Sequence, residues 1–84
     1  MFKNKNEDRN NLCGENVRMY RLSYPTKLSQ KKLADKMQLI GIDVAKNAIQ
    51  RIESGKRFVT DIELKAFSFI FGVTIEKLLA EPKQ

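Results

Sequence analysis

The sequence predicts an all-α protein with five helices. Apolar residues recur at helical spacing along the 84-residue chain, and Ser29, Thr60 and Thr74 stand where helix N-caps are expected. There is no sustained period-2 alternation and no Asn-Gly or Asp-Gly hairpin dipeptide. A chain of this length forms one domain with a compact core, so a large enclosed active-site cavity is not expected. We expect the domain over residues 11–81, after a polar, flexible tail over residues 1–10.

The first helix is expected over residues 11–23. Leu12, Val17 and Tyr20 would lie along its inner side. Pro25 would end it, because proline disfavours the helical conformation in the residue before it.

The second helix is expected to begin after Ser29, a good N-cap residue, and to run through the sequence QKKLADKMQL. Leu33, Ala34 and Met37 recur at i, i+1 and i+4 and would face the core. Gly41 would end this helix or its turn.

The third helix is expected from Val44 to about Ser54, with Asp43 as its N-cap. Ile49 and Ile52 would be buried. Gly55 would take the left-handed conformation that commonly follows a helix.

The fourth helix is expected to open with a capping box, because Thr60 and Glu63 have the required spacing. It would continue to Gly72 as the most buried helix of the domain or of a complex, and its large apolar residues are Leu64, Phe67, Phe69, Ile70 and Phe71. Phe69 and Phe71 lie about 200° apart on a helix, so at least one would be exposed or covered by the fifth helix or a second subunit. The fifth helix, TIEKLLA, would be capped by Thr74 and ended by Pro82.

The net charge of +6 is concentrated in the first two thirds of the chain. Residues 28–57 carry seven Lys or Arg against three Asp or Glu, whereas residues 58–84 carry three against four. A basic surface attracts polyanions, although a merely soluble basic surface would explain the charge equally well. No apolar run approaches the ~20 residues needed to span a bilayer, and the N-terminus lacks a secretory signal, so we expect a cytoplasmic protein.

Catalytic and metal chemistry are poorly supported by the residues present. The chain has no His, and its single cysteine, Cys13, has neither a disulfide partner nor an imidazole base. The carboxylates show no metal-ligand spacing. The sequence SGKR lacks the remainder of a phosphate-binding loop. We therefore expect no enzyme activity, no cofactor and no metal.

Three segments resemble one known family. LSQKKLADKM, IQRIESGKR and DIELKAFSFIFGVTIEKLL are similar to the lambda-repressor and Cro-like (XRE) helix-turn-helix family over residues 14–79. The residues that match in order are Leu28, Gln30, Leu33, Ala34, Ile49, Ile52, Glu53, Gly55, Leu64, Gly72 and Leu78. The resemblance implies a lambda-repressor-like domain in which the second and third helices form the helix-turn-helix. The segment QLIGID departs from the family by about five extra residues in the turn, and YPTK slightly lengthens the first loop.

The resemblance implies that the third helix, over residues 44–53, lies in the major groove of DNA. Its base-contacting candidates are Ala45, Lys46, Asn47, Gln50 and Arg51. Lys and Arg can donate to guanine, Asn and Gln can pair with adenine, and an alanine methyl can touch thymine. On any solvated helix, the same polar residues would be ordinary surface residues.

Phosphate contacts would come from the frame around that helix, and the candidates are Ser29, Gln30, Lys31, Lys56 and Arg57. Alternatively, Ser29 is only a cap and the Lys-Arg pair a solvated turn. Arg21 and Glu53 match two positions that form an ion pair in the family, which would set the angle of the third helix.

The resemblance implies a sequence-specific regulator of transcription that binds double-stranded DNA, most simply a repressor. We expect a homodimer on DNA, with a near-palindromic operator as its binding site. The alternative is a protein-interaction module of the same fold, such as an antitoxin, which would bind its partner through the C-terminal helices.

Overall fold

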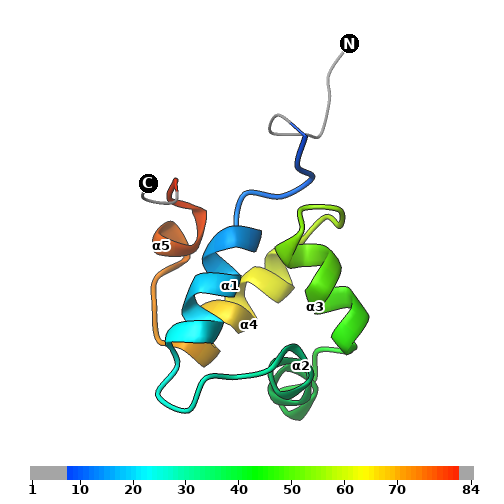
Figure 1. Ribbon diagram of the computed structural model, residues 1–84, viewed down its shortest axis with the longest axis vertical. Helices are drawn as coiled ribbons and strands as arrows, with labels where there is room; N and C mark the ends of the chain where they lie inside the picture. The colour runs from blue at the N-terminus through cyan, green and yellow to red at the C-terminus, as the bar shows by residue number, and fades with distance from the viewer. Residues whose placement is uncertain (1–7, 82–84) are drawn as a thin grey trace.

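The computed structural model describes residues 8–81, and over that range it is all-α. It contains α1 (Gly14–Ser23), α2 (Gln30–Leu39), α3 (Lys46–Glu53), α4 (Asp61–Phe71) and α5 (Ile75–Leu79), with no strand among the described residues. α1 and α4 lie at the centre, α3 and α2 lie to one side, and α5 lies on the other (Figure 1). The predicted number and order of helices are confirmed. None of the helices described is long and apolar enough to cross a membrane.

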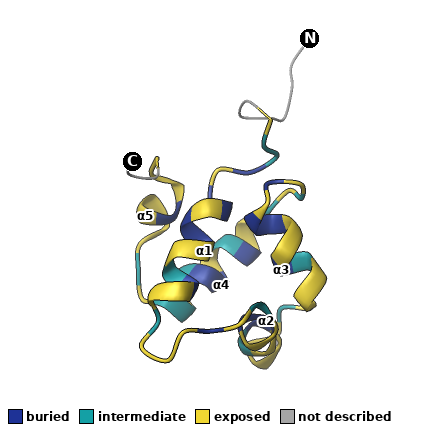
Figure 2. Ribbon diagram, in the orientation of Figure 1, coloured by how far each residue is buried: buried dark blue, intermediate teal, exposed yellow. Residues whose placement is uncertain are grey.

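The core is built from the inward sides of all five helices. Its largest fully buried side chains are Phe67, Leu33, Met37, Ile49, Ile52, Leu78 and Val17. Buried residues line the inner sides of the helices, and the outer sides are exposed (Figure 2). Burial of this apolar surface is the main force that holds five short helices together, because isolated helices of this length are marginal in water.

α1 begins later than predicted, at Gly14 rather than Asn11. The Asn11 side chain accepts a hydrogen bond from the Gly14 backbone N–H at 2.8 Å, which forms a turn ahead of the helix. Leu12 therefore lies outside the helix and is 51% exposed, so its predicted core position is wrong. Val17 is buried as predicted, and Tyr20 is half-buried.

α2 matches its prediction at both ends. The Ser29 hydroxyl accepts from the Lys32 backbone N–H, and Leu33, Ala34 and Met37 are buried. After the helix, Gly41 takes φ +89°, and the N–H groups of residues 41 and 42 donate to the carbonyls of Gln38 and Met37. This is the Schellman arrangement, in which two otherwise unpaired carbonyls are satisfied.

α3 is shorter than predicted, because it begins at Lys46 rather than at Val44 and ends at Glu53. Asp43 is exposed and does not cap it; Ala45 occupies the N-cap position without a side-chain bond, so the predicted cap is wrong. Val44 lies in the core ahead of the helix, and its carbonyl accepts from the Gln38 side chain at 2.7 Å. Burial of Val44 holds this residue in the turn rather than in the helix.

α4 opens with the predicted capping box, in which Thr60 and Glu63 each bond the other's backbone N–H. Phe67 is fully buried, and Phe71 stacks on it with ring centroids 6.2 Å apart. Phe69 is 75% exposed, which confirms that the aromatic residues do not share one side. α4 is therefore not enclosed by the rest of the domain, because Ile62 and Phe69 are exposed on it together with Asp61 and Lys65.

α5 has the predicted Thr74 cap, whose hydroxyl accepts from the Lys77 backbone N–H. Leu78 is its one buried residue. Pro82, which was expected to end this helix, lies outside the described residues.

Candidate nucleic-acid interface

The two sides of α3 differ sharply in exposure and in chemistry. Ile49 and Ile52 are fully buried. The five predicted base-contacting residues are all exposed, namely Ala45, Lys46, Asn47, Gln50 and Arg51. The outward side of α3 faces away from the rest of the molecule (Figure 2). It therefore presents the hydrogen-bonding groups of Lys46, Asn47, Gln50 and Arg51 on a helix whose other side anchors it in the core.

Arg21 of α1 and Glu53 of α3 form the predicted ion pair. Arg21 Nε donates to Glu53 Oε2 at 2.7 Å and Nη2 donates to Oε1 at 2.9 Å, with side chains only 9% and 4% exposed. The remaining terminal nitrogen of Arg21 donates to the Leu28 carbonyl at 2.9 Å. Such a two-bond contact fixes both distance and orientation, so it sets the angle of α3 relative to α1.

Gln30 joins this pair from the first residue of α2. Its side-chain amide donates to Glu53 Oε1 at 3.1 Å. The carboxylate of Glu53 thus receives bonds from two helices, and α1, α2 and α3 are connected through one buried charge. Gln30, a predicted phosphate contact, is half-buried and lies at the junction of α2 and α3.

The other predicted phosphate contacts on α2 lie at its N-terminal end. Ser29 is exposed, but its hydroxyl is used as the helix cap. Lys31 is exposed and pairs with Asp35 one turn later, at 3.2 Å. Because both side chains of that pair are more than half exposed, the pair is weak and the lysine remains accessible to an anion.

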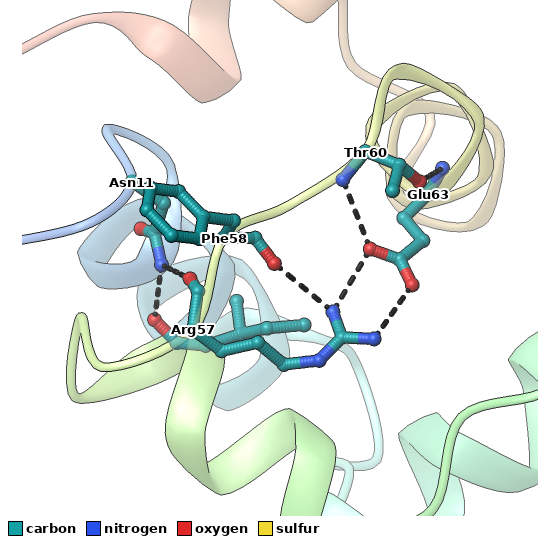
Figure 3. Close-up of polar contacts among 6 residues, drawn as sticks. Asn11, Arg57, Phe58, Thr60 and Glu63 are labelled. Atoms are coloured by element: carbon teal, nitrogen blue, oxygen red, sulfur yellow. Dashed lines mark hydrogen bonds and ion pairs between the residues drawn. The ribbon is translucent and has the colours of Figure 1, made fainter. Parts of the chain in front are cut away.

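The loop after α3 separates the two remaining predicted phosphate contacts. Lys56 is exposed. The Arg57 guanidinium is instead bonded to the Glu63 carboxylate, through Nη1 to Oε1 and Nη2 to Oε2, both at 2.9 Å (Figure 3). The sequence suggested two equivalent cations here, whereas the structure gives one of them an internal partner.

The Arg57–Glu63 pair also shifts the ionisation of both groups. Burial disfavours the charged form of Glu63, but hydrogen bonds from Arg57 and from the Thr60 backbone N–H outweigh it, so the pKa of Glu63 is lowered. The hydrogen bond to Glu63 raises the pKa of Arg57 in turn. The capping box of α4 and the loop after α3 are therefore joined through one carboxylate.

Residues 9–11 bind the C-terminal end of α3, a contact that the sequence did not predict. The Asn11 side-chain amide donates to the carbonyls of Ile52 at 3.0 Å and Arg57 at 2.8 Å (Figure 3). Arg9 donates to the Glu53 carbonyl at 2.8 Å. Asn10 donates through its backbone to Gly55 at 2.7 Å and through its side chain to Lys56 at 3.1 Å.

Two of the residues in this contact, Arg9 and Asn10, lie in the range that was expected to be a flexible tail. Residues 9 and 10 belong to the hydrogen-bonded structure, and residues 1–7 lie outside the described range. Five carbonyls over residues 52–57 are satisfied by residues 9–11. The sequence signal was a run of polar residues before the first helix, and nothing local in that run indicates which carbonyls it would meet.

The remaining candidate chemistry is sparse among residues 8–81. Cys13 is buried, and burial raises the pKa of its thiol to about 11. No group of three or more His, Cys, Asp or Glu side chains in that range could hold a metal ion. A surface hollow of about 540 Å³ between α1 and α5 is lined mainly by apolar atoms, including those of Met19 and Tyr20.

Comparison with protein-family models, with curated proteins and with solved structures finds no match.

Proposed function

We propose that the protein is a sequence-specific regulator of transcription that binds double-stranded DNA. In this proposal α2 and α3 form the helix-turn-helix of a lambda-repressor-like domain, the family that the sequence resembles, and α3 lies in the major groove. The observation that carries the proposal is the outward side of α3. It presents Lys46, Asn47, Gln50 and Arg51, all exposed, on a helix seated by two fully buried isoleucines.

The chemistry of that surface suits base recognition. Arg51 and Lys46 supply donors for guanine O6 and N7, whereas Asn47 and Gln50 supply both donors and acceptors for adenine. Ala45, the exposed N-cap residue, offers a methyl group that can touch a thymine methyl. Four adjacent groups of these types can distinguish several base pairs.

The rigid attachment of α3 supports the same proposal. A recognition helix has to keep its angle when it enters a groove of DNA. The carboxylate of Glu53, the last residue of α3, is bonded to Arg21 from α1 and to Gln30 from α2, and these bonds hold that angle. Residues 9–11 bind the other side of the same helix end. Specific contacts are stronger when the helix is already held in its binding orientation, because ordering it on binding would cost affinity.

Phosphate contacts in this proposal come from both ends of the α2–α3 unit. The first turn of α2 offers backbone N–H groups together with Lys31, and the loop after α3 offers Lys56. Counterion release from DNA then makes the affinity fall steeply with salt. A homodimer on a near-palindromic operator would place two copies of α3 about 34 Å apart.

Selection of binding sites from a random duplex library, followed by fluorescence titration at two salt concentrations, tests the proposal. We expect Arg51→Ala to weaken binding to the selected site by about tenfold or more, in line with about 1 to 3 kcal/mol for a base contact. Lys77→Ala, which removes an exposed cation on α5, is the matched control and should change affinity less than about twofold. The absence of salt-dependent binding to any duplex would sink the proposal.

The exposed apolar residues of α4 favour one alternative. Ile62 and Phe69 are 66% and 75% exposed, which suits a protein-interaction module, such as an antitoxin, that binds its partner through the C-terminal helices. The combined change Lys46→Ala and Arg51→Ala separates the two functions. The double substitution abolishes the activity of the protein in the cell if α3 reads DNA. It leaves that cellular activity unchanged if a protein partner is the target.

A further inference from the structure

Three large apolar side chains form an exposed cluster where the C-terminal ends of α2 and α4 meet. Leu39 is 85% exposed, Phe69 is 75% exposed and Ile40 is 42% exposed. Tyr24 and Ile70 lie beside them and are half-buried. We call these five residues the α2–α4 patch. Leu39 and Ile40 belong to QLIGID, the segment whose extra length the resemblance to DNA-binding domains leaves unexplained.

The α2–α4 patch contains a groove as well as projecting side chains. A hollow of about 230 Å³ is lined by all five residues and by Lys36. A projecting side chain beside a hollow on one surface is the arrangement that a two-fold contact needs. In such a contact, each subunit inserts its side chain into the hollow of the other.

We propose that the α2–α4 patch is the site at which two copies of this chain associate through a two-fold axis. Leu39 and Phe69 expose most of their surface and Ile40 exposes nearly half of its surface. The largest apolar patch on a single chain is often a functional one. A stable dimer buries about 800 Å² per subunit around an apolar centre, and these three side chains supply such a centre.

The charged residues around the patch have both signs, which suits a second copy of the same surface. Asp35 and Lys36 precede Leu39 by four and three residues on α2, so both lie on the same side of the helix. Lys36 also lies over the Tyr24 ring, with its amino group 5.4 Å from the centroid. Across a two-fold axis, the carboxylate of one subunit can meet the lysine of the other at the edge of the contact.

The α2–α4 patch includes none of the base-contacting candidates. Leu39 is the last residue of α2, nine residues and about 13 Å along the axis from Gln30 in the first turn that is proposed to meet phosphate. None of the patch residues belongs to α3. Self-association therefore does not rest on the proposed DNA binding and can be measured without DNA.

Sedimentation equilibrium of the full chain from roughly 1 μM to 1 mM protein tests the proposal. We expect the mass to rise toward twice that of one chain, and to do so in high salt as well, because the centre of the contact is apolar. Leu39→Glu and Phe69→Glu should each weaken association at least about tenfold, because each buries a charge in the contact. Met19→Glu changes a 47% exposed side chain on α1 and should leave association unchanged.

Circular dichroism of each variant establishes that it is folded, and chemical-shift changes of the wild-type chain with concentration provide a second measurement. Shifts confined to residues near Tyr24, Leu39 and Phe69 support the proposal. A chain that stays monomeric to 1 mM overturns it, and so does a dimer that survives both patch substitutions. Shifts centred on α1 and α5 also overturn it, because they place the contact elsewhere.

Discussion

Arg21 and Glu53, which are 32 positions apart in the sequence, are joined by two hydrogen bonds of 2.7 and 2.9 Å in the interior of the domain. The pair connects the last turn of α1 to the last residue of α3. Removing one partner leaves the other charge buried without compensation. That penalty exceeds the value of an exposed pair several times over.

Glu53→Gln should therefore lower the free energy of unfolding by about 3 to 5 kcal/mol, measured by urea denaturation. Asp35→Asn is the control, because it breaks the exposed Lys31–Asp35 pair and should cost less than about 0.5 kcal/mol. Equal effects of the two substitutions would show that the interior pair contributes no more than a surface one.

Asn11→Ala should destabilise the domain by about 1 to 3 kcal/mol, because the change leaves the carbonyls of Ile52 and Arg57 and the N–H of Gly14 without their side-chain partner. Asn47→Ala removes the same side chain from the exposed side of α3 and should be neutral or slightly stabilising, since alanine favours a helix. Thermal unfolding of both variants provides the comparison. A neutral Asn11→Ala would mean that residues 9–11 do not hold the end of α3.

Gly14→Ala should cost at least about 2 kcal/mol, because the added methyl would meet the Ile52 carbonyl oxygen and neither backbone can easily move away. Gly41→Ala gives the contrast. Gly41 has φ +89° and nothing within 4 Å of an added methyl, so only backbone strain of about 1 kcal/mol is expected. The denaturant midpoints of the two variants test this difference. A lower midpoint for Gly41→Ala than for Gly14→Ala would contradict the predicted clash at Gly14.

The Arg57–Glu63 pair should make stability depend on acid pH. The pKa of Glu63 is lower in the folded chain than its ordinary value of 4.5, so its stabilising contribution is complete above that value and is lost as the pH falls through the folded pKa. The difference in unfolding free energy between wild type and Glu63→Gln should therefore be constant from about pH 7 to about pH 5.5 and shrink below about pH 4.5. A difference that stays the same down to pH 3 would contradict the lowered pKa.

The most accurate sequence predictions concern features that depend on a few neighbouring residues. α2 has the predicted first and last residues because Ser29 caps it and Gly41 supplies a left-handed turn after it. The capping box of α4 and the threonine cap of α5 are of the same kind. Errors arose where a distant segment competes with the local signal. Asn11 bonds to the end of α3 instead of opening α1, and Val44 enters the core instead of the helix that Asp43 was expected to cap.

By itself the sequence determined the all-α class, the five helices and which side of α3 faces outward, because apolar spacing and caps act over a few residues. Only the tertiary structure decided that Arg57 bonds to Glu63, that residues 9–11 bind the end of α3, and that Leu39 and Phe69 share one exposed surface. Each of these depends on segments that are brought together by burial of a common core. The spacing of residues along the chain does not say which distant segments that burial brings into contact.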